Sequence, residues 1–246
     1  MLASMNMPTS DLRRAALIAA LAWPLADAAR AFGFATAGSG RIAHAEFDLP
    51  AFQAIELGGD TAVTLVQSRT PRVAVDIDDN LQALFEPRVQ DGRLSLHFRE
   101  SVRPTRRHIV VSVWTLERVT LGGSALLQSE LLVAKQLKLR AGGSSVIRLA
   151  DLTAETVEVQ LSGSANARLA GQANELNLEL GGSGSLDAGA LQVRRARAEM
   201  GGSSHARVWA SESLGGAIGG SSQLRYRGEA RVNVARGGSA RVELLN

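Results

Sequence analysis

The stretch LKLRAGGSSVIRL, residues 137–149, decides the fold of this chain. Apolar and charged residues alternate strictly before the Gly142-Gly143 pair, and the alternation resumes after it with Ile147 and Leu149 as apolar members. A period of two puts alternate side chains on opposite faces of a β-strand, so each half is a strand with one buried face. The glycine pair suits a tight corner, because glycine accepts positive φ. The stretch therefore predicts a strand, a corner and a second strand.

The same pattern recurs to the end of the sequence. Aligned on the serine that follows the glycine pair, or Ser162-Gly163 in one copy, the copies are 20, 20, 19, 20, 18 and 18 residues apart. One copy alone cannot bury its apolar face, whereas stacked copies share a continuous narrow core. We therefore predict an all-β fold, a β-helix-like solenoid over residues 121–246 with Gly-Gly-Ser repeats of 18–20 residues. The aligned serines are Ser124, Ser144, Ser164, Ser183, Ser203, Ser221 and Ser239.

Each repeat also needs a second turn to return the chain to the stack. The expected second turns lie at residues 151–153, 171–174 and 187–189. The aligned serines are interpreted as turn residues whose hydroxyls bond the local backbone. They are not interpreted as nucleophiles, since the sequence has no Gly-x-Ser-x-Gly elbow with a placed histidine.

Residues 38–120 lack the regular repeat and predict a β-rich N-terminal cap. Short runs with alternating and β-branched residues lie at 62–66, 73–77, 94–98 and 109–113, which favours strands. Asp91-Gly92 is typical of a hairpin turn. The segment 79–85 is where a short helical turn is expected.

Residues 1–37 have the layout of a secretory signal peptide. Arg13 and Arg14 precede an apolar run at 15–22, and A-x-A-like cleavage sites end at Ala28 and Ala37. An amphipathic helix of a cytosolic protein is the alternative. No run is long enough to span a bilayer as a helix in the mature chain. We therefore expect an exported protein of the periplasm or cell surface, with no transmembrane segment after cleavage.

The composition limits both the core and the partners. Hydrophobic residues make up 45% of the chain and aromatic residues only 4%, so the core consists of Ala, Val and Leu and must be thin. The net charge is +3, and the arginines are interleaved with acids. Nucleic-acid binding needs a more concentrated basic surface, so no nucleic-acid partner is expected. The chain has no cysteine, which excludes disulfides and thiolate metal sites.

Several short motifs of the entry region lead into the repeats: 52–57 (FQAIEL), 73–75, 89–94 and the first repeat entry at 116–124. These motifs, with the repeats to the C-terminus, resemble the "putative autotransporter-adhesin head GIN domain" family. The resemblance covers about four-fifths of the chain. The resemblance implies an exported, right-handed β-helix with an adhesin-type role, and it brings no catalytic residues with it.

One outward column of the repeats is the candidate ligand-binding site. The fourth residue after the aligned serine is Arg148, Arg168, Arg207 or Arg225 in four copies, and Asp187 interrupts the line. One interpretation is a solvated edge that keeps the sheet soluble. The other is an anion-binding stripe for an acidic glycan or envelope polymer, because a guanidinium group grips a carboxylate or phosphate with two bonds.

No metal or cofactor is expected. A calcium-binding glycine repeat fails after Gly181, because the required acid comes one place late, at Asp187. The histidines lack the spacing of metal ligands; they are His44, His97, His108 and His205.

The expected function is therefore binding or scaffolding in the cell envelope, without catalysis. An acidic polymer or another envelope protein is the expected partner, and the oligomeric state stays open. A glycan-active β-helix enzyme is one alternative, since Glu179 and Glu199 share a column in adjacent copies, like a retaining glycosidase pair. The scattered acids and the lack of nearby Trp or Tyr favour a solvated pair instead. An envelope-stress accessory protein with a protein partner is the other alternative.

Overall fold

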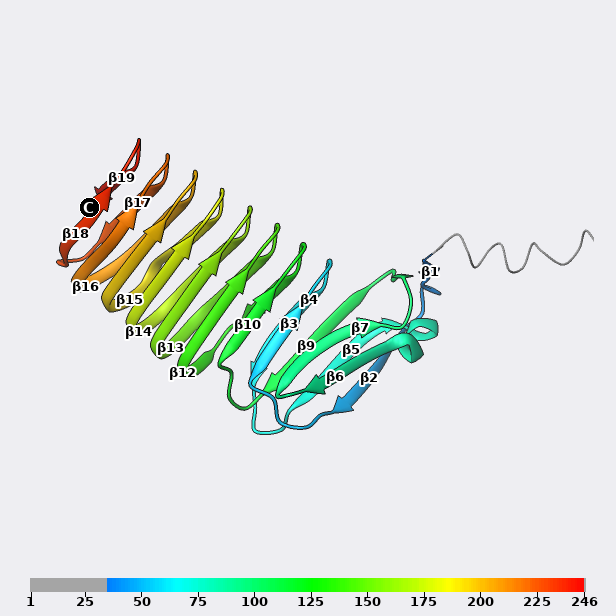
Figure 1. Ribbon diagram of the computed structural model, residues 1–246. Helices are drawn as coiled ribbons and strands as arrows, with labels where there is room; N and C mark the ends of the chain where they lie inside the picture. The colour runs from blue at the N-terminus through cyan, green and yellow to red at the C-terminus, as the bar shows by residue number, and fades with distance from the viewer. Residues whose placement is uncertain (1–34, 246) are drawn as a thin grey trace, which may run out of the picture.

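The computed structural model describes residues 35–245, and these form an elongated stack of β-strand rungs with a β-rich cap at its N-terminal end (Figure 1). The expected signal peptide and its cleavage point at Ala28 lie outside the described residues. The fold class is confirmed: the repeats build an all-β solenoid. The only helix in residues 35–245 is η1 (Asp79–Leu84), a short 3-10 helix at the expected place. No helix in this part of the chain has the length and hydropathy of a membrane span.

Each rung contributes one strand segment before its Gly-Gly corner and one after it. The segments before the corner stack in parallel and form the pre-turn layer. It consists of β3 (Ala54–Leu57), β10 (Arg118–Leu121), β12 (Leu132–Ala141), the second halves of β13 (Val146–Leu161), β14 (Asn166–Leu180), β15 (Ser185–Met200) and β16 (His205–Ile218), and β18 (Arg231–Arg236).

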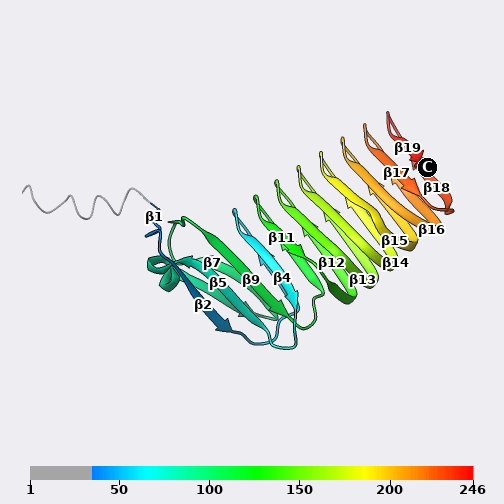
Figure 2. The same ribbon diagram turned by 180° about the vertical axis from the view of Figure 1, so that it is seen from behind.

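The segments after the corner form the post-turn layer in the same way (Figure 2). It consists of β4 (Ala62–Gln67), β11 (Leu126–Ser129), the first halves of β13 to β16, β17 (Gln223–Arg227) and β19 (Arg241–Leu244).

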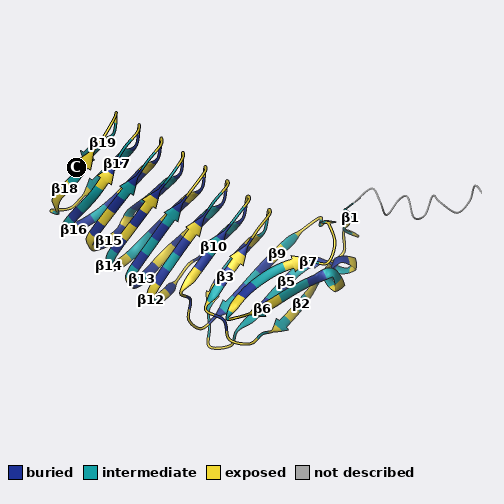
Figure 3. Cartoon of the chain, in the orientation of Figure 1, coloured by how far each residue is buried: buried dark blue, intermediate teal, exposed yellow. Residues whose placement is uncertain are grey.

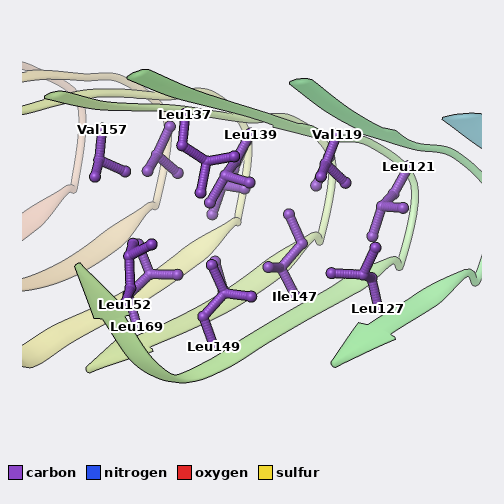
Figure 4. Close-up of a cluster of buried hydrophobic side chains, with 14 of the residues drawn as sticks. Val119, Leu121, Leu127, Leu137, Leu139, Ile147, Leu149, Leu152, Val157 and Leu169 are labelled. Carbon is purple, nitrogen blue, oxygen red and sulfur yellow. The ribbon is translucent and has the colours of Figure 1, made fainter. Parts of the chain in front are cut away.

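The core lies between the two layers and is made of stacked aliphatic columns. Leu137 and Leu139 point inward from the pre-turn layer, and Ile147 and Leu149 approach them from the post-turn layer (Figure 4). All four are almost fully buried, and burial alternates along the inner strands except where they bend (Figure 3). The expected thin core of Ala, Val and Leu is confirmed.

Backbone contact between rungs explains the glycine pairs. Gly143 has a φ of +69°, and a Cβ atom there would lie 2.6 Å from the carbonyl oxygen of Gly123 in the preceding rung. The Ser144 backbone N–H donates to that same oxygen at 2.7 Å. The expected role of the serine hydroxyls needs correction: the residue one place later donates, as in the 2.8 Å bond from Ser145 Oγ to the Gly142 carbonyl.

The expected second turns also need correction. Leu132–Ala134 pairs with Leu152–Ala154, and Leu152–Ala154 pairs with Gly171–Ala173, so these residues form a short third side of the coil. In the third case, Asp187 and Ala188 still belong to the post-turn layer. The residues typical of turns at these places mark bends of the chain on either side of a short strand segment. A segment of two or three residues is too short for alternation to reveal it as a strand.

The cap extends both layers by further strands. β7 (Arg93–Phe98) and then β6 (Phe85–Gln90) continue the pre-turn layer. β9 (Arg107–Val113), β5 (Arg72–Asp78) and β2 (Ile42–Asp48) continue the post-turn layer. Phe85 contacts both Phe47 and Phe98 between these strands, with ring centroids 5.7 Å and 5.3 Å apart. The expected Asp91-Gly92 hairpin turn joins β6 to β7.

The stack runs across the expected boundary between cap and solenoid at residues 120 and 121. β3 pairs with β10 and β4 with β11, so residues 54–67 form the first rung. The Ser124 N–H donates to the carbonyl oxygen of Gly59, which puts Gly58-Gly59 at the start of the glycine column. The chain then leaves the stack to build the rest of the cap and returns at β10.

A buried carboxylate fixes the far end of the cap. Asp78 is fully buried, and it accepts bonds from the Gly40 N–H at 2.7 Å, the Thr105 N–H at 2.8 Å and the Thr105 hydroxyl at 2.6 Å. The Thr105 hydroxyl is the largest cause that holds the pKa of Asp78 below its usual value. Beside it, β1 (Thr36–Ala37) pairs in parallel with β8 (Val102–Arg103).

Candidate anion-binding face

The four predicted arginines lie in one line on the outer face of the post-turn layer. Arg148 is the register partner of Arg168, and Arg207 is that of Arg225. Asp187 lies between the two pairs, in register with Arg168 on one side and Arg207 on the other. The structure therefore brings the predicted residues together as two pairs separated by one acid.

Acidic side chains in the same column offset part of this charge. Asp187 lies 3.3 Å from Arg168 and 3.9 Å from Arg207, measured from carboxylate oxygen to guanidinium nitrogen. Glu243 lies 3.4 Å from Arg225 in the last rung. Arg148 makes no ion pair within residues 35–245. The two acids thus offset part of the repulsion between neighbouring arginines. Four arginines face two acids, so the column keeps an excess of positive charge.

The neighbouring columns add basic groups that the serine alignment missed. Arg227 lies two residues beyond Arg225 on the same outer face, and Arg241 lies in the last rung beside Gln223. Residues 190–246 carry nine arginines against four acids, a net charge of +5, whereas residues 35–189 carry 15 basic against 18 acidic residues, a net charge of −3. A charge count along the sequence would have shown that the basic character gathers in the last three rungs.

An aromatic side chain accompanies these arginines. The Arg227 guanidinium lies 4.0 Å from the centroid of the Trp209 ring, in the geometry of a cation–π contact. The two residues are register partners in β16 and β17. Trp209 is half-buried, so this contact restricts where the Arg227 guanidinium lies at the surface.

The pre-turn layer carries the other predicted pair. Glu179 and Glu199 are register partners in adjacent rungs, as expected. Glu179 accepts a 3.0 Å bond from Gln160, and Glu199 lies 2.8 Å from Arg197. The shallow groove beside them is lined by aliphatic, glycine and arginine residues, without an aromatic ring among its lining residues. Each of the two carboxylates already has a polar or basic neighbour within the chain.

The cap contains a charge cluster that the sequence did not reveal. His44 Nδ1 lies 2.7 Å from Asp76, and His108 Nδ1 lies 3.6 Å from the other oxygen of Asp76. The hydrogen bond to Asp76 is the main cause that raises the pKa of His44 above 6.5. The hydrogen bond with His44 likewise lowers the pKa of Asp76 below its usual value. No group of three potential ligands able to hold a metal ion occurs within residues 35–245.

The fold defines this chain as a capped β-solenoid with a basic end. Residues 51–230 match the family model described as "Putative auto-transporter adhesin, head GIN domain". The chain belongs to this family, and the resemblance seen in the sequence is confirmed.

Solved structures with the same fold come from Bacteroides and Parabacteroides species. A "putative adhesin" from Bacteroides fragilis has a TM-score of 0.78 and 21% identity, and the match covers 85% of this chain and 99% of that one. A "putative adhesin" from Parabacteroides merdae has a TM-score of 0.71 and 21% identity over 86% and 99%. A "Putative lipid binding protein" from Parabacteroides distasonis has a TM-score of 0.69 and 20% identity over 87% and 100%. A search of curated proteins found no match.

Proposed function

We propose that this chain is an exported, non-enzymatic binding module of the cell envelope whose post-turn layer binds acidic polymers. The observation that carries the proposal is the basic outer face of the post-turn layer in residues 190–246, which has four arginines against one acid, Glu243. The four arginines are Arg207, Arg225, Arg227 and Arg241. Membership of a family described as adhesins supports a role in binding. The signal-peptide layout of residues 1–37 supports export.

The spacing of the rungs suits a polymer. Neighbouring strands lie about 4.8 Å apart, so a column presents its charged groups at regular short intervals. An acidic chain laid along the column meets Arg207 and Arg225, with the Trp209–Arg227 stack beside them in the same two rungs. Each guanidinium can hold a carboxylate or phosphate with two parallel bonds. Arg148 and Arg168 extend the same line beyond Asp187.

A binding assay with defined polymers tests the proposal. The full chain is titrated with polygalacturonate, dextran sulfate and neutral dextran at several salt concentrations. We expect binding to the two polyanions that weakens as salt rises, because salt screens the attraction, and none to neutral dextran. Equal binding to neutral dextran, or binding that salt leaves unchanged, contradicts the proposal.

Variants locate the site. Changing Arg207, Arg225, Arg227 and Arg241 together to Gln is expected to abolish most polyanion binding. Changing Arg148 and Arg168 to Gln is expected to weaken it less. The control changes four cap arginines to Gln and removes the same charge elsewhere; these are Arg88, Arg93, Arg99 and Arg103. If the control loses as much affinity as the first variant, the binding follows net charge and the face is not a site.

A further inference from the structure

The last rung of the stack has two free strand edges. Within residues 35–245, β18 pairs only with β16 and β19 only with β17, at the end of this stack opposite the cap (Figure 1). The inward side chains Val232 and Leu244 are 39% and 55% exposed, whereas Leu176 and Leu169 in the same columns of inner rungs are fully buried. This end therefore presents an open core that one more rung would cover.

Backbone hydrogen bonds show which groups point to the free edge. The N–H groups of Gly237 and Arg241 donate to the carbonyl oxygens of Ile218 and Ser222 in the preceding rung. Successive residues of a strand direct their N–H and C=O groups to opposite sides. The backbone groups of Val232 and Val234 in β18, and of Val242 and Leu244 in β19, therefore point away from the stack.

The sequences of these two strands are self-complementary in an antiparallel pairing. When two β19 strands pair about Val242, Arg241 of each copy lies opposite Glu243 of the other copy. The pairing therefore contains two equivalent Arg–Glu pairs. When two β18 strands pair about Asn233, Val232 lies opposite the partner's Val234, on the inner face. Opposite charges and apolar pairs directly across from each other stabilise antiparallel strands.

One two-fold axis serves both pairings. Asn233 lies four residues before Gly237, and Val242 lies four residues after Gly238, so both stand at the same distance from the Gly-Gly corner. A two-fold axis perpendicular to both layers would pass between the two copies of Asn233 and between the two copies of Val242. Rotation about this axis places a second copy whose strands extend both the pre-turn and the post-turn layer. The directions of the backbone groups agree with this axis. The Val242 groups point outward, so the two copies of Val242 form a hydrogen-bonded pair, whereas the Asn233 groups point into the stack, so the two copies of Asn233 form a non-hydrogen-bonded pair.

We propose that two copies of this chain associate end to end through β18 and β19, as an isologous dimer. The opposite end does not invite the same contact, because the edge strand β6 contains Pro87 and β2 carries charged side chains along its length, two devices that discourage edge pairing. An isologous contact closes at two copies. The dimer does not depend on polymer binding, although Arg241 belongs to both surfaces; crosslinking through Asn233 tests the dimer apart from the polymer site.

A cysteine test probes the axis directly, since the chain has no cysteine. Two Asn233 residues facing each other in a non-hydrogen-bonded pair have Cα atoms about 4.5 Å apart, within the range of roughly 4.4–6.8 Å that a disulfide bridges. Under oxidation, the full chain with Asn233→Cys is expected to form a covalent dimer. The control is Asn177→Cys, in the same outer column of an inner rung, which is expected to stay unlinked.

Charge exchange tests the register. Analytical ultracentrifugation should show the full chain as a dimer. Arg241→Glu or Glu243→Arg alone sets like charges opposite each other and should give folded monomers, with the β-sheet circular dichroism spectrum of the unchanged chain. An equimolar mixture of the two variants restores both ion pairs and should give a heterodimer. Arg241→Glu with Glu243→Arg in one chain should also dimerise.

Three results overturn the proposal. The first is a monomer at every concentration at which the protein is soluble, which would show that β18 and β19 do not pair with a second copy. The second is a dimer that survives both single exchanges, which places the contact on another face. The third is equal crosslinking of the two cysteine variants.

Discussion

The Cβ position of Gly202 lies 2.4 Å from the carbonyl oxygen of Gly182, closer than any side chain tolerates. The two glycines occupy the same place in successive corners, and the Ser203 N–H donates to that oxygen at 2.8 Å. The backbone of each corner thus lies directly against the backbone of the preceding corner, and no side chain fits between them.

Replacing Gly202 by alanine tests this contact. Gly202 has a φ of +74°, so the substitution combines backbone strain of roughly 1–2 kcal/mol with the clash. We expect a loss of at least about 2 kcal/mol in the free energy of unfolding. Gly201→Ala is the matched control, since no atom lies within 4 Å of the added methyl group. Chemical denaturation measures both, and equal losses would contradict the stacking argument.

The His44–Asp76 contact predicts a pH dependence. The pKa of His44 is raised, so its contribution to stability is complete below 6.5 and is lost as pH rises through the folded value. The pKa of Asp76 is lowered, so its contribution is lost as pH falls through its own folded value. In an NMR titration we expect the His44 midpoint above 6.5, and Asp76→Asn should bring it back toward 6.5. Asp79→Asn serves as control; a His44 midpoint unaffected by Asp76→Asn would rule out this assignment.

Excision of one whole rung should leave a folded protein. Removing residues 145–164 joins Ser144 to Ala165, and Ala165 is the equivalent of Ser145 in the next rung. The remaining rungs contact their neighbours at equivalent positions. Removing only residues 145–154 joins a corner to the wrong side of the coil and should abolish cooperative melting. Circular dichroism compares the two deletions, and similar melting curves would refute the repeat arrangement.

The cleavage site of the expected signal peptide can now be narrowed. Cleavage after Ala37 would remove β1, whose Thr36 N–H donates to the Ser101 carbonyl. Cleavage after Ala28 keeps this strand, so we expect the mature protein to begin at residue 29. N-terminal sequencing of protein from the cell envelope decides this, and an intact Met1 would show that no signal peptide is removed.

The repeats were predictable because each corner and its flanking strands lie within about twenty residues of sequence. Gly143, Ile147 and Leu149 appear in the expected places for that reason. The first rung was assigned to the cap, because its two strands are separated by a long excursion from the rung they contact. The His44–Asp76–His108 cluster was missed for a similar reason, since antiparallel pairing of β2, β5 and β9 brings its members together. Alternation predicts which face a side chain occupies, but it does not predict which strand lies beside it.

The pairing distances along the chain set an order of assembly. β3 and β4 meet β10 and β11 across 64 positions, whereas Leu132 pairs with Leu152 and Ser213 with Arg231 across 20 and 18. Closing the long loop costs more chain entropy than closing a short one, and slow folding accompanies distant contacts. The slow step therefore belongs to the junction around β3 and β4. Each later rung closes over a short loop on its neighbour, so we expect the stack from β12 onward to form without waiting for that junction.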